Sequence, residues 1–132
     1  NAPNGLIAYR EGAAMAAADP WRITIKGRQA HGSRPWDSID PIMVAFQIGH
    51  NLQTIVSRRL VLRESPAVIA VGSIHVGVRS HIIPYVVEME GTIRTFDSNI
   101  RETSLSEMRT IDEKTAEIAG ASVDVYLPNG QS

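Results

Sequence analysis

Cysteine is absent from the 132-residue sequence. Disulfide bonds, thiolate nucleophiles and zinc–thiolate sites are therefore excluded. The chain also lacks an excess of charge of either sign, because 13 Lys and Arg residues stand against 14 Asp and Glu residues. Nucleic-acid and membrane surfaces need basic side chains concentrated on one face. We therefore expect neither a nucleic-acid partner nor a membrane partner.

Long apolar runs are missing as well, and the longest is far too short to span a bilayer. Aromatic residues make up only 5% of the chain, whereas hydrophobic residues make up 43% and charged residues 20%. This composition is typical of one globular domain with a single core. Because the first residue is Asn1 rather than Met, we expect a fragment or processed product of a longer protein.

The periodicity of apolar residues predicts six elements. They are a strand at 21–26, a helix at 42–60, strands at 67–76 and 83–96, a helix from 99 to 118 and a strand at 123–127. Strand–helix–strand–strand–helix–strand is the split βαβ, or ferredoxin-like, order. We therefore predict an α+β, ferredoxin-like βαββαβ sandwich, in which two helices cover one face of a four-stranded antiparallel sheet.

The helix ends and buried faces can also be predicted. We expect Ser38 or Asp40 to cap the first helix, Asn99 to cap the second in a capping box with Glu102, and Gly120 to end it. The first apolar stripe is Ile42, Ala45, Phe46, Gly49, Leu52, Val56 and Leu60, and Gly49 is a place for close packing. The second stripe is Leu105, Met108, Ile111, Thr115 and Ile118.

Metal chemistry has little support in these residues. The four histidines are scattered, without the spacing of a chelating pair. His50 lies in the predicted helix and His75 in a predicted strand, so a solvated or hydrogen-bonded role is favoured for both. His31 differs, because it lies in a loop, 28–38, where glycine and proline constrain the backbone. An imidazole there can donate a hydrogen bond to an oxyanion or act structurally, and both interpretations stay open.

Six segments in a fixed order are spread along the chain and carry a match that covers nearly all of it. They are MAAAD at 15–19, ITIKGRQAHGSRPW at 23–36, DP at 40–41, VGSIHVG at 71–77, IP at 83–84 and GTIRTFD at 91–97. In order and spacing they resemble the dimerisation (lid) domain of zinc-dependent amidohydrolases of the aminoacylase/hippurate hydrolase/carboxypeptidase family. The resemblance implies a ferredoxin-like domain inserted between two halves of a zinc-binding catalytic domain.

Further expectations follow from the resemblance. Residues 1–132 would be a single lid domain excised from a larger two-domain metallohydrolase that cleaves N-acyl-amino acids or peptides. The zinc ligands would lie in the missing catalytic domain, so this fragment would hold no metal and would be inactive alone. The alternative is a stand-alone ferredoxin-like domain that binds a ligand or regulates, since fold does not determine function. Sequence flanking this chain would separate the two.

The resemblance also implies roles for three residues. The histidine matching His31 reaches a catalytic zinc site, often that of the partner subunit, and stabilises the tetrahedral oxyanion. The arginine matching Arg94 holds the substrate carboxylate, although a surface ion pair is the structural alternative. The family usually has asparagine, which contacts substrate, where this chain has His81. Histidine can still donate a hydrogen bond there, with a different reach and a titratable proton.

The strand at 67–76 is the expected contact for a homodimer. It is apolar and carries no acidic or basic group besides His75, so an unpaired edge there would invite aggregation. We expect Ile69 and Val71 to point to one face and Val68 and Ala70 to the other. Two-fold antiparallel pairing with its twin would merge two sheets. The helix at 42–60 would pack alongside its twin.

Overall fold

The computed structural model describes residues 17–28, 35–56, 58–59, 67–76 and 86–128. Its elements are strand β1 (Ala17–Lys26), 3-10 turn η2 (Pro35–Asp37), helix α1 (Pro41–Asn51), π-helical turn η3 (Leu52–Val56), strands β2 (Ala67–Val76) and β3 (Val86–Thr95), helix α3 (Ser98–Ala119) and strand β4 (Ser122–Tyr126). None of the described helices is long and apolar enough to cross a membrane.

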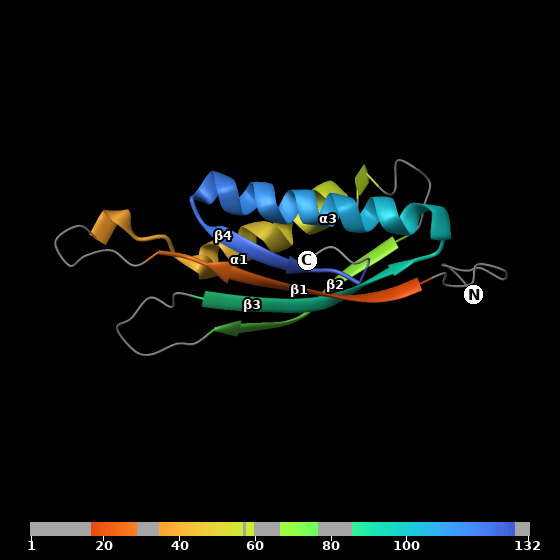
Figure 1. The fold of residues 1–132 in the computed structure, drawn as a ribbon, viewed down its shortest axis with the longest axis horizontal. Coiled ribbons are helices and arrows are strands. Elements are labelled where there is room, and N and C mark those ends of the chain that lie inside the picture. The colour runs from red at the N-terminus through yellow and green to blue at the C-terminus, as the bar shows by residue number, and fades with distance from the viewer. Residues whose placement is uncertain (1–16, 29–34, 57, 60–66, 77–85, 129–132) are drawn as a thin grey trace.

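The four strands form one sheet in the order β2-β3-β1-β4, and every neighbouring pair is antiparallel. Helices α1 and α3 lie side by side on one face of this sheet, and no described element covers the other face (Figure 1). This arrangement confirms the predicted ferredoxin-like α+β fold. It also confirms that β2, the strand predicted to be an edge, lies at one side of the sheet, with β4 at the other.

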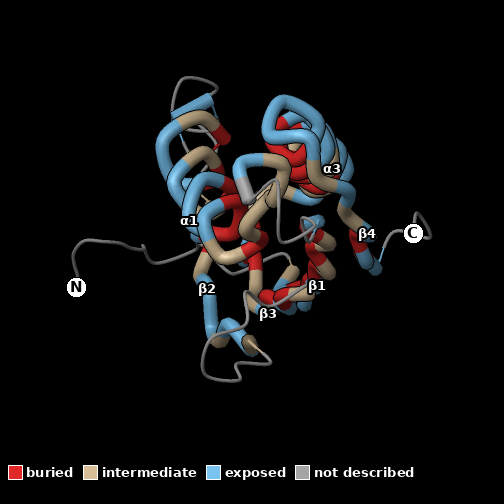
Figure 2. The backbone as a smooth tube through the Cα atoms, turned by 90° about the vertical axis from the view of Figure 1, so that its left-hand side faces the viewer, coloured by how far each residue is buried: buried red, intermediate tan, exposed pale blue. Residues whose placement is uncertain are grey.

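The core lies between the helices and the sheet. Along β1, Trp21, Ile23 and Ile25 are buried against the helices, while Arg22 between them faces away. Burial of this kind stabilises a domain by roughly 25 cal/mol for each Å² of apolar surface removed from water. Figure 2 shows the buried backbone concentrated where the sheet and the two helices face each other.

Several predicted details differ from the structure. Strand β1 begins at Ala17 rather than Trp21, because its pairing with β3 continues to Thr95. Phe46 is 58% exposed and Ile118 is 88% exposed, although both were predicted to face the core. Consecutive helical residues are 100° apart, so the burial of Ala45 turns Phe46 away from the sheet. In the last turns of α3, Thr115 and its neighbour Ala116 are the buried residues.

The helix termini agree with the predictions in part. Asp40, one of the two expected residues, caps α1 by accepting a 2.9 Å hydrogen bond from the N–H of Ile42. Helix α3 is capped by Asp97, which accepts from the N–H of Asn99 at 2.8 Å, so the predicted Asn99 cap is wrong. Gly120 ends α3 as predicted, with a left-handed φ of 79° that glycine adopts at little cost.

Candidate functional site

The two ends of the loop that carries His31 are held together. Arg28 and Ile39 form an antiparallel bridge, with N–H to carbonyl distances of 3.0 and 2.7 Å, and Arg28 Nε also donates to the Asp37 carbonyl at 3.0 Å. His31 itself lies outside the described residues. The structure therefore places the base of its loop, directly after β1, and leaves its predicted role untested.

Glycine is required at the start of this loop. A Cβ at Gly27 would overlap the Ile39 carbonyl oxygen and lie 2.6 Å from Pro41 Cδ. The close approach lets the chain leave β1 and return directly into α1. Within the loop, Trp36 in the η2 turn is 73% exposed. A large aromatic side chain in such a position is a candidate contact that periodicity alone did not single out.

Arg94 lies near the end of β3, exposed on the face of the sheet that the helices leave open. Its Nη1 donates to Thr92 Oγ1 at 3.3 Å. Among the described residues no carboxylate lies within ion-pair distance of this guanidinium. Within the described part of the chain, the surface ion pair considered as the structural alternative is therefore not formed. The predicted role of Arg94 in binding a carboxylate stays a prediction.

The described strand ends that lead into the two histidine-bearing loops lie at the opposite end of the sheet from Arg94. Lys26, the last residue of β1, pairs with Val86, the first residue of β3. His31 follows Lys26 by five residues and His81 precedes Val86 by five, and both lie outside the described residues. Arg94 lies eight residues further along β3, about 26 Å away at 3.3 Å per residue. Both loops thus start from the end of the sheet opposite Arg94.

The edge strand β2 and the outer side of α1 expose apolar side chains. Val68, Val71 and Ile74 on β2 and Met43 and Phe46 on α1 are all large and exposed. Up to Val71 the side chains alternate as predicted, because Ile69 lies opposite Ile93 of the core and Val68 lies opposite Arg94 of the open face.

A β-bulge interrupts the edge strand between Val71 and Ser73. Bulges bend a strand and increase its twist. Ile69 before the bulge is 5% exposed, but Val71 and Ile74 are each 38% exposed. The second half of β2 therefore presents apolar side chains that the helices do not cover.

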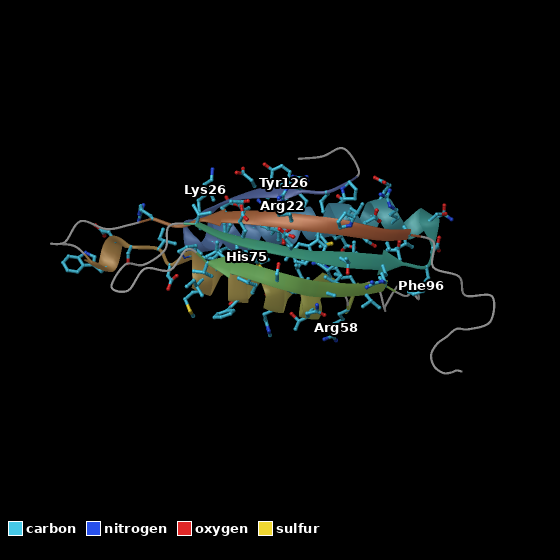
Figure 3. The ribbon with its side chains drawn as sticks, turned by 90° about the horizontal axis from the view of Figure 1, so that it is seen from below. Arg22, Lys26, Arg58, His75, Phe96 and Tyr126 are labelled. Atoms are coloured by element: carbon cyan, nitrogen blue, oxygen red, sulfur yellow. The ribbon has the colours of Figure 1, made fainter. Side chains whose placement is uncertain are left out.

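The open face of the sheet carries charge of both signs. Arg22 lies 5.2 Å from the ring centroid of Tyr126, and Lys26 Nζ lies 3.4 Å from Asp124 Oδ2. The labelled side chains of Arg22, Lys26 and Tyr126 project from neighbouring strands β1 and β4 in Figure 3. Such exposed pairs contribute little stability, so they favour a solvated or polar-contact surface rather than a core.

One buried acid lies away from these surfaces. Asp112 on α3 is 0% exposed, and neither carboxylate oxygen has a hydrogen-bond partner. Burial raises the pKa of Asp112 well above its usual value, an effect that Arg109 opposes and Glu113 reinforces. The apolar periodicity did not identify this residue, because an aspartate within a helix is expected to be an exposed polar residue.

The described residues offer no metal site. No three His, Asp or Glu side chains among them lie together as metal ligands would. His50 and His75 are both exposed, on separate elements, α1 and β2. Their surroundings agree with the solvated role that the sequence favoured.

The chain is similar to known proteins in sequence and in fold. A family model described as the peptidase dimerisation domain matches residues 18–120. The chain is 38% identical over 123 residues to thermostable carboxypeptidase 2 of Saccharolobus solfataricus, and the match covers 93% of this chain and 31% of that protein. It is 38% identical over 134 residues to N-acetylcysteine deacetylase of Bacillus subtilis, covering 98% of this chain and 35% of that protein.

A solved structure from Bacillus subtilis, described as a dinuclear metal binding peptidase from the M20 family, superposes with a TM-score of 0.66. The two sequences are 32% identical, and the match covers 90% of this chain and 27% of that one. The chain spans about a third of the length of the curated relatives it matches.

Proposed function

The chain belongs to the peptidase dimerisation domain family of M20 peptidases and amidohydrolases, and we propose that it dimerises and completes the active site of a metal-dependent amidohydrolase. Residues 1–132 would be one lid domain of that larger protein. Its relatives are named a carboxypeptidase and a deacetylase. The proposed substrates are accordingly small N-acyl-amino acids or peptides.

The observation that carries the proposal is the exposed apolar edge of the sheet. In the part of the chain that the structure describes, strand β2 has a neighbour on one side only, so backbone N–H and C=O groups along its other side lack sheet partners there. Val68, Val71 and Ile74 on this strand, with Met43 and Phe46 on α1, supply apolar area. A second copy pairing antiparallel with β2 would satisfy the backbone and cover apolar side chains of the strand.

The proposed site needs both copies. Arg94 and the loops of His31 and His81 start at opposite ends of one sheet. If the partner subunit supplied the histidine, a single copy would not need to bring residues from both ends of its own sheet to one substrate. In this proposal His31 donates a hydrogen bond to the oxyanion that develops during amide hydrolysis. Arg94 binds the substrate carboxylate, and His81 contacts the substrate.

The metal is proposed to bind outside this chain, since the described residues lack a ligand set. Zinc or another divalent metal would supply activated water there. The 132-residue chain alone is therefore expected to hydrolyse no acyl-amino acid. Stoichiometric zinc in the purified chain, together with turnover of hippurate, would contradict this assignment.

Sedimentation equilibrium of the chain at micromolar concentration tests the dimer. We expect twice the monomer mass of 14.4 kDa, and we expect Val71→Lys to dissociate the pair by placing a charge in the apolar edge. The matched control, Ser122→Lys, adds the same charge to the exposed β4 edge and should leave the dimer intact. A mass of one chain for the unaltered protein would overturn the proposal. It would favour the stand-alone ligand-binding or regulatory domain.

A further inference from the structure

We propose that Gln53 closes the first half of the β2 edge, so that a second copy pairs along the other half, from Val71 to Val76. This inference rests on the dimer proposed above, and it adds the position of the two-fold axis along β2. Gln53 Nε2 donates a 2.7 Å hydrogen bond to the carbonyl oxygen of Ile69. A side chain from the helix layer thus occupies a backbone acceptor of the edge strand.

The neighbouring residue shows which way this carbonyl points. A Cβ built on Gly91 of β3 would overlap the carbonyl oxygen of Ala70, so the Ala70 backbone faces β3. Consecutive residues of a strand present their backbone groups to opposite sides. The backbone of Ile69 therefore faces the free edge. Gln53 covers the acceptor that an incoming strand would use there.

Gln53 is held in place by its own turn. It lies in η3, between Leu52 and Val56, which are both fully buried in the core. These two anchors fix the turn beside β2, while Gln53 itself stays exposed at the rim. An approaching strand would have to displace the Gln53 amide. Otherwise it would find the carbonyl oxygen of Ile69 already occupied. Edge strands are commonly protected by coverage of this kind.

The second half of β2 has no such cover. Among the described residues no side chain hydrogen-bonds to the backbone of 71–76. In register, Val71 lies opposite Gly91 and Ile74 opposite Met89, so both face the helix side of the sheet. Figure 2 shows this end of β2 exposed and furthest from the helices. His75, labelled in Figure 3, marks the same half on the open face.

These observations locate the two-fold axis. In an antiparallel pair of identical strands, the residue on the axis lies opposite its own copy. Pairing centred on Ser73 to His75 leaves the Gln53 hydrogen bond near the periphery and places the two Ile74 side chains opposite each other or no more than two residues apart. Pairing centred on Val68 would require two Gln53 side chains to be displaced. The structure favours the first register.

The absence of cysteine makes this register measurable. Directly opposed residues in an antiparallel pair have Cα atoms about 4.5–5.5 Å apart, within the 4.4–6.8 Å range of disulfides. We suggest four single variants: Val68→Cys, Ser73→Cys, Ile74→Cys and His75→Cys. Mild oxidation followed by non-reducing electrophoresis reports which of them forms a covalent dimer. We expect a strong cross-link within 73–75 and at least tenfold less at Val68→Cys.

A second pair of variants tests Gln53 itself. Gln53→Ala in the Val68→Cys background should raise its cross-linked fraction several-fold, because the first half of the edge is then open. Gln47→Ala is the matched control, since that amide donates to Asn51 within the helix layer and leaves β2 alone. An efficient Val68→Cys cross-link with Gln53 present, or no change on removing Gln53, would overturn the inference. A monomeric mass in every variant and in the parent chain would overturn the proposed dimer instead.

Discussion

The guanidinium of Arg101 binds both carboxylate oxygens of Asp19, Nε to Oδ2 and Nη2 to Oδ1, each at 2.8 Å. Asp19 belongs to β1 and Arg101 to the first turns of α3, and Figure 1 shows these segments meeting at one end of the molecule. The Asp19 side chain is only 10% exposed and that of Arg101 26%. The hydrogen bond to Asp19 also raises the pKa of Arg101, so the guanidinium stays charged.

Removing this pair should destabilise the fold. We expect Arg101→Ala to lower the free energy of unfolding by about 2 kcal/mol, because it leaves a nearly buried carboxylate without its partner. Urea unfolding measures the change. Lys114→Ala is the control, because its ion pair with Glu117 is about 70% exposed on both sides, and it should change stability by less than about 0.5 kcal/mol. Equal effects of the two variants would contradict the structural role of Arg101.

The buried Asp112 should make stability depend on pH. Because its folded-state pKa is raised above 3.8, the folded chain keeps a proton that the unfolded chain releases. The free energy of unfolding should therefore fall as pH rises from about 4 to the folded-state pKa, and level off above it. The full stabilising contribution of the protonated Asp112 side chain is present only at the lower end of this pH range.

Asp112→Asn tests this dependence with a neutral side chain of the same shape. We expect the variant to be more stable than the parent chain at pH 7 and to differ little from it at pH 4. Urea unfolding at several pH values gives the comparison. Glu113→Gln removes the neighbouring, 52% exposed carboxylate that helps to raise the pKa of Asp112, so it should narrow the pH range of the fall slightly without abolishing it. Parallel profiles for the parent chain and Asp112→Asn would show that Asp112 is ionised in the fold.

Two glycines should respond oppositely to alanine. A Cβ at Gly91 would overlap the Ala70 carbonyl oxygen and Trp21 Cζ2 and lie 2.7 Å from Trp21 Cε2. Gly91→Ala should therefore cost about 3 kcal/mol of stability through overpacking. At Gly49 the nearest atom, Met89 Cε, is 3.8 Å away, so the predicted need for close packing is wrong. Gly49→Ala should stabilise by up to about 1 kcal/mol. Thermal unfolding of both variants measures the contrast.

The proposed site roles can be tested in the protein that carries this domain together with its catalytic domain. We expect His31→Ala to lower kcat about a hundredfold, as loss of one oxyanion donor does. Arg94→Ala should mainly raise KM for substrates with a carboxylate, whereas Arg22→Ala, another exposed arginine on the open face, should not. Steady-state kinetics separates the two effects. If His31→Ala kept kcat within about twofold of the parent value, a role of His31 in stabilising the transition state would be contradicted.

The order of the elements and several of their ends can be predicted from the residues alone. Alternation along β1, the three- and four-residue spacing in α1 and α3, the Asp40 cap and the Gly120 stop depend on residues close in the chain. Local backbone and side-chain geometry governs all of these features. The apolar, nearly uncharged segment at 67–76 was identifiable as an edge strand for the same reason.

Which residues meet across the chain depends instead on how the helices and strands pack together. Asp19 and Arg101 are 82 positions apart, and Gln53 reaches Ile69 only because η3 packs beside β2. The exposure of Phe46, the bulge after Val71 and the burial of Asp112 likewise depend on how the helices sit on the sheet. A pattern along one segment specifies which side of that segment is apolar. The neighbours that cover that side, or leave it open, belong to other segments, and packing alone brings them together.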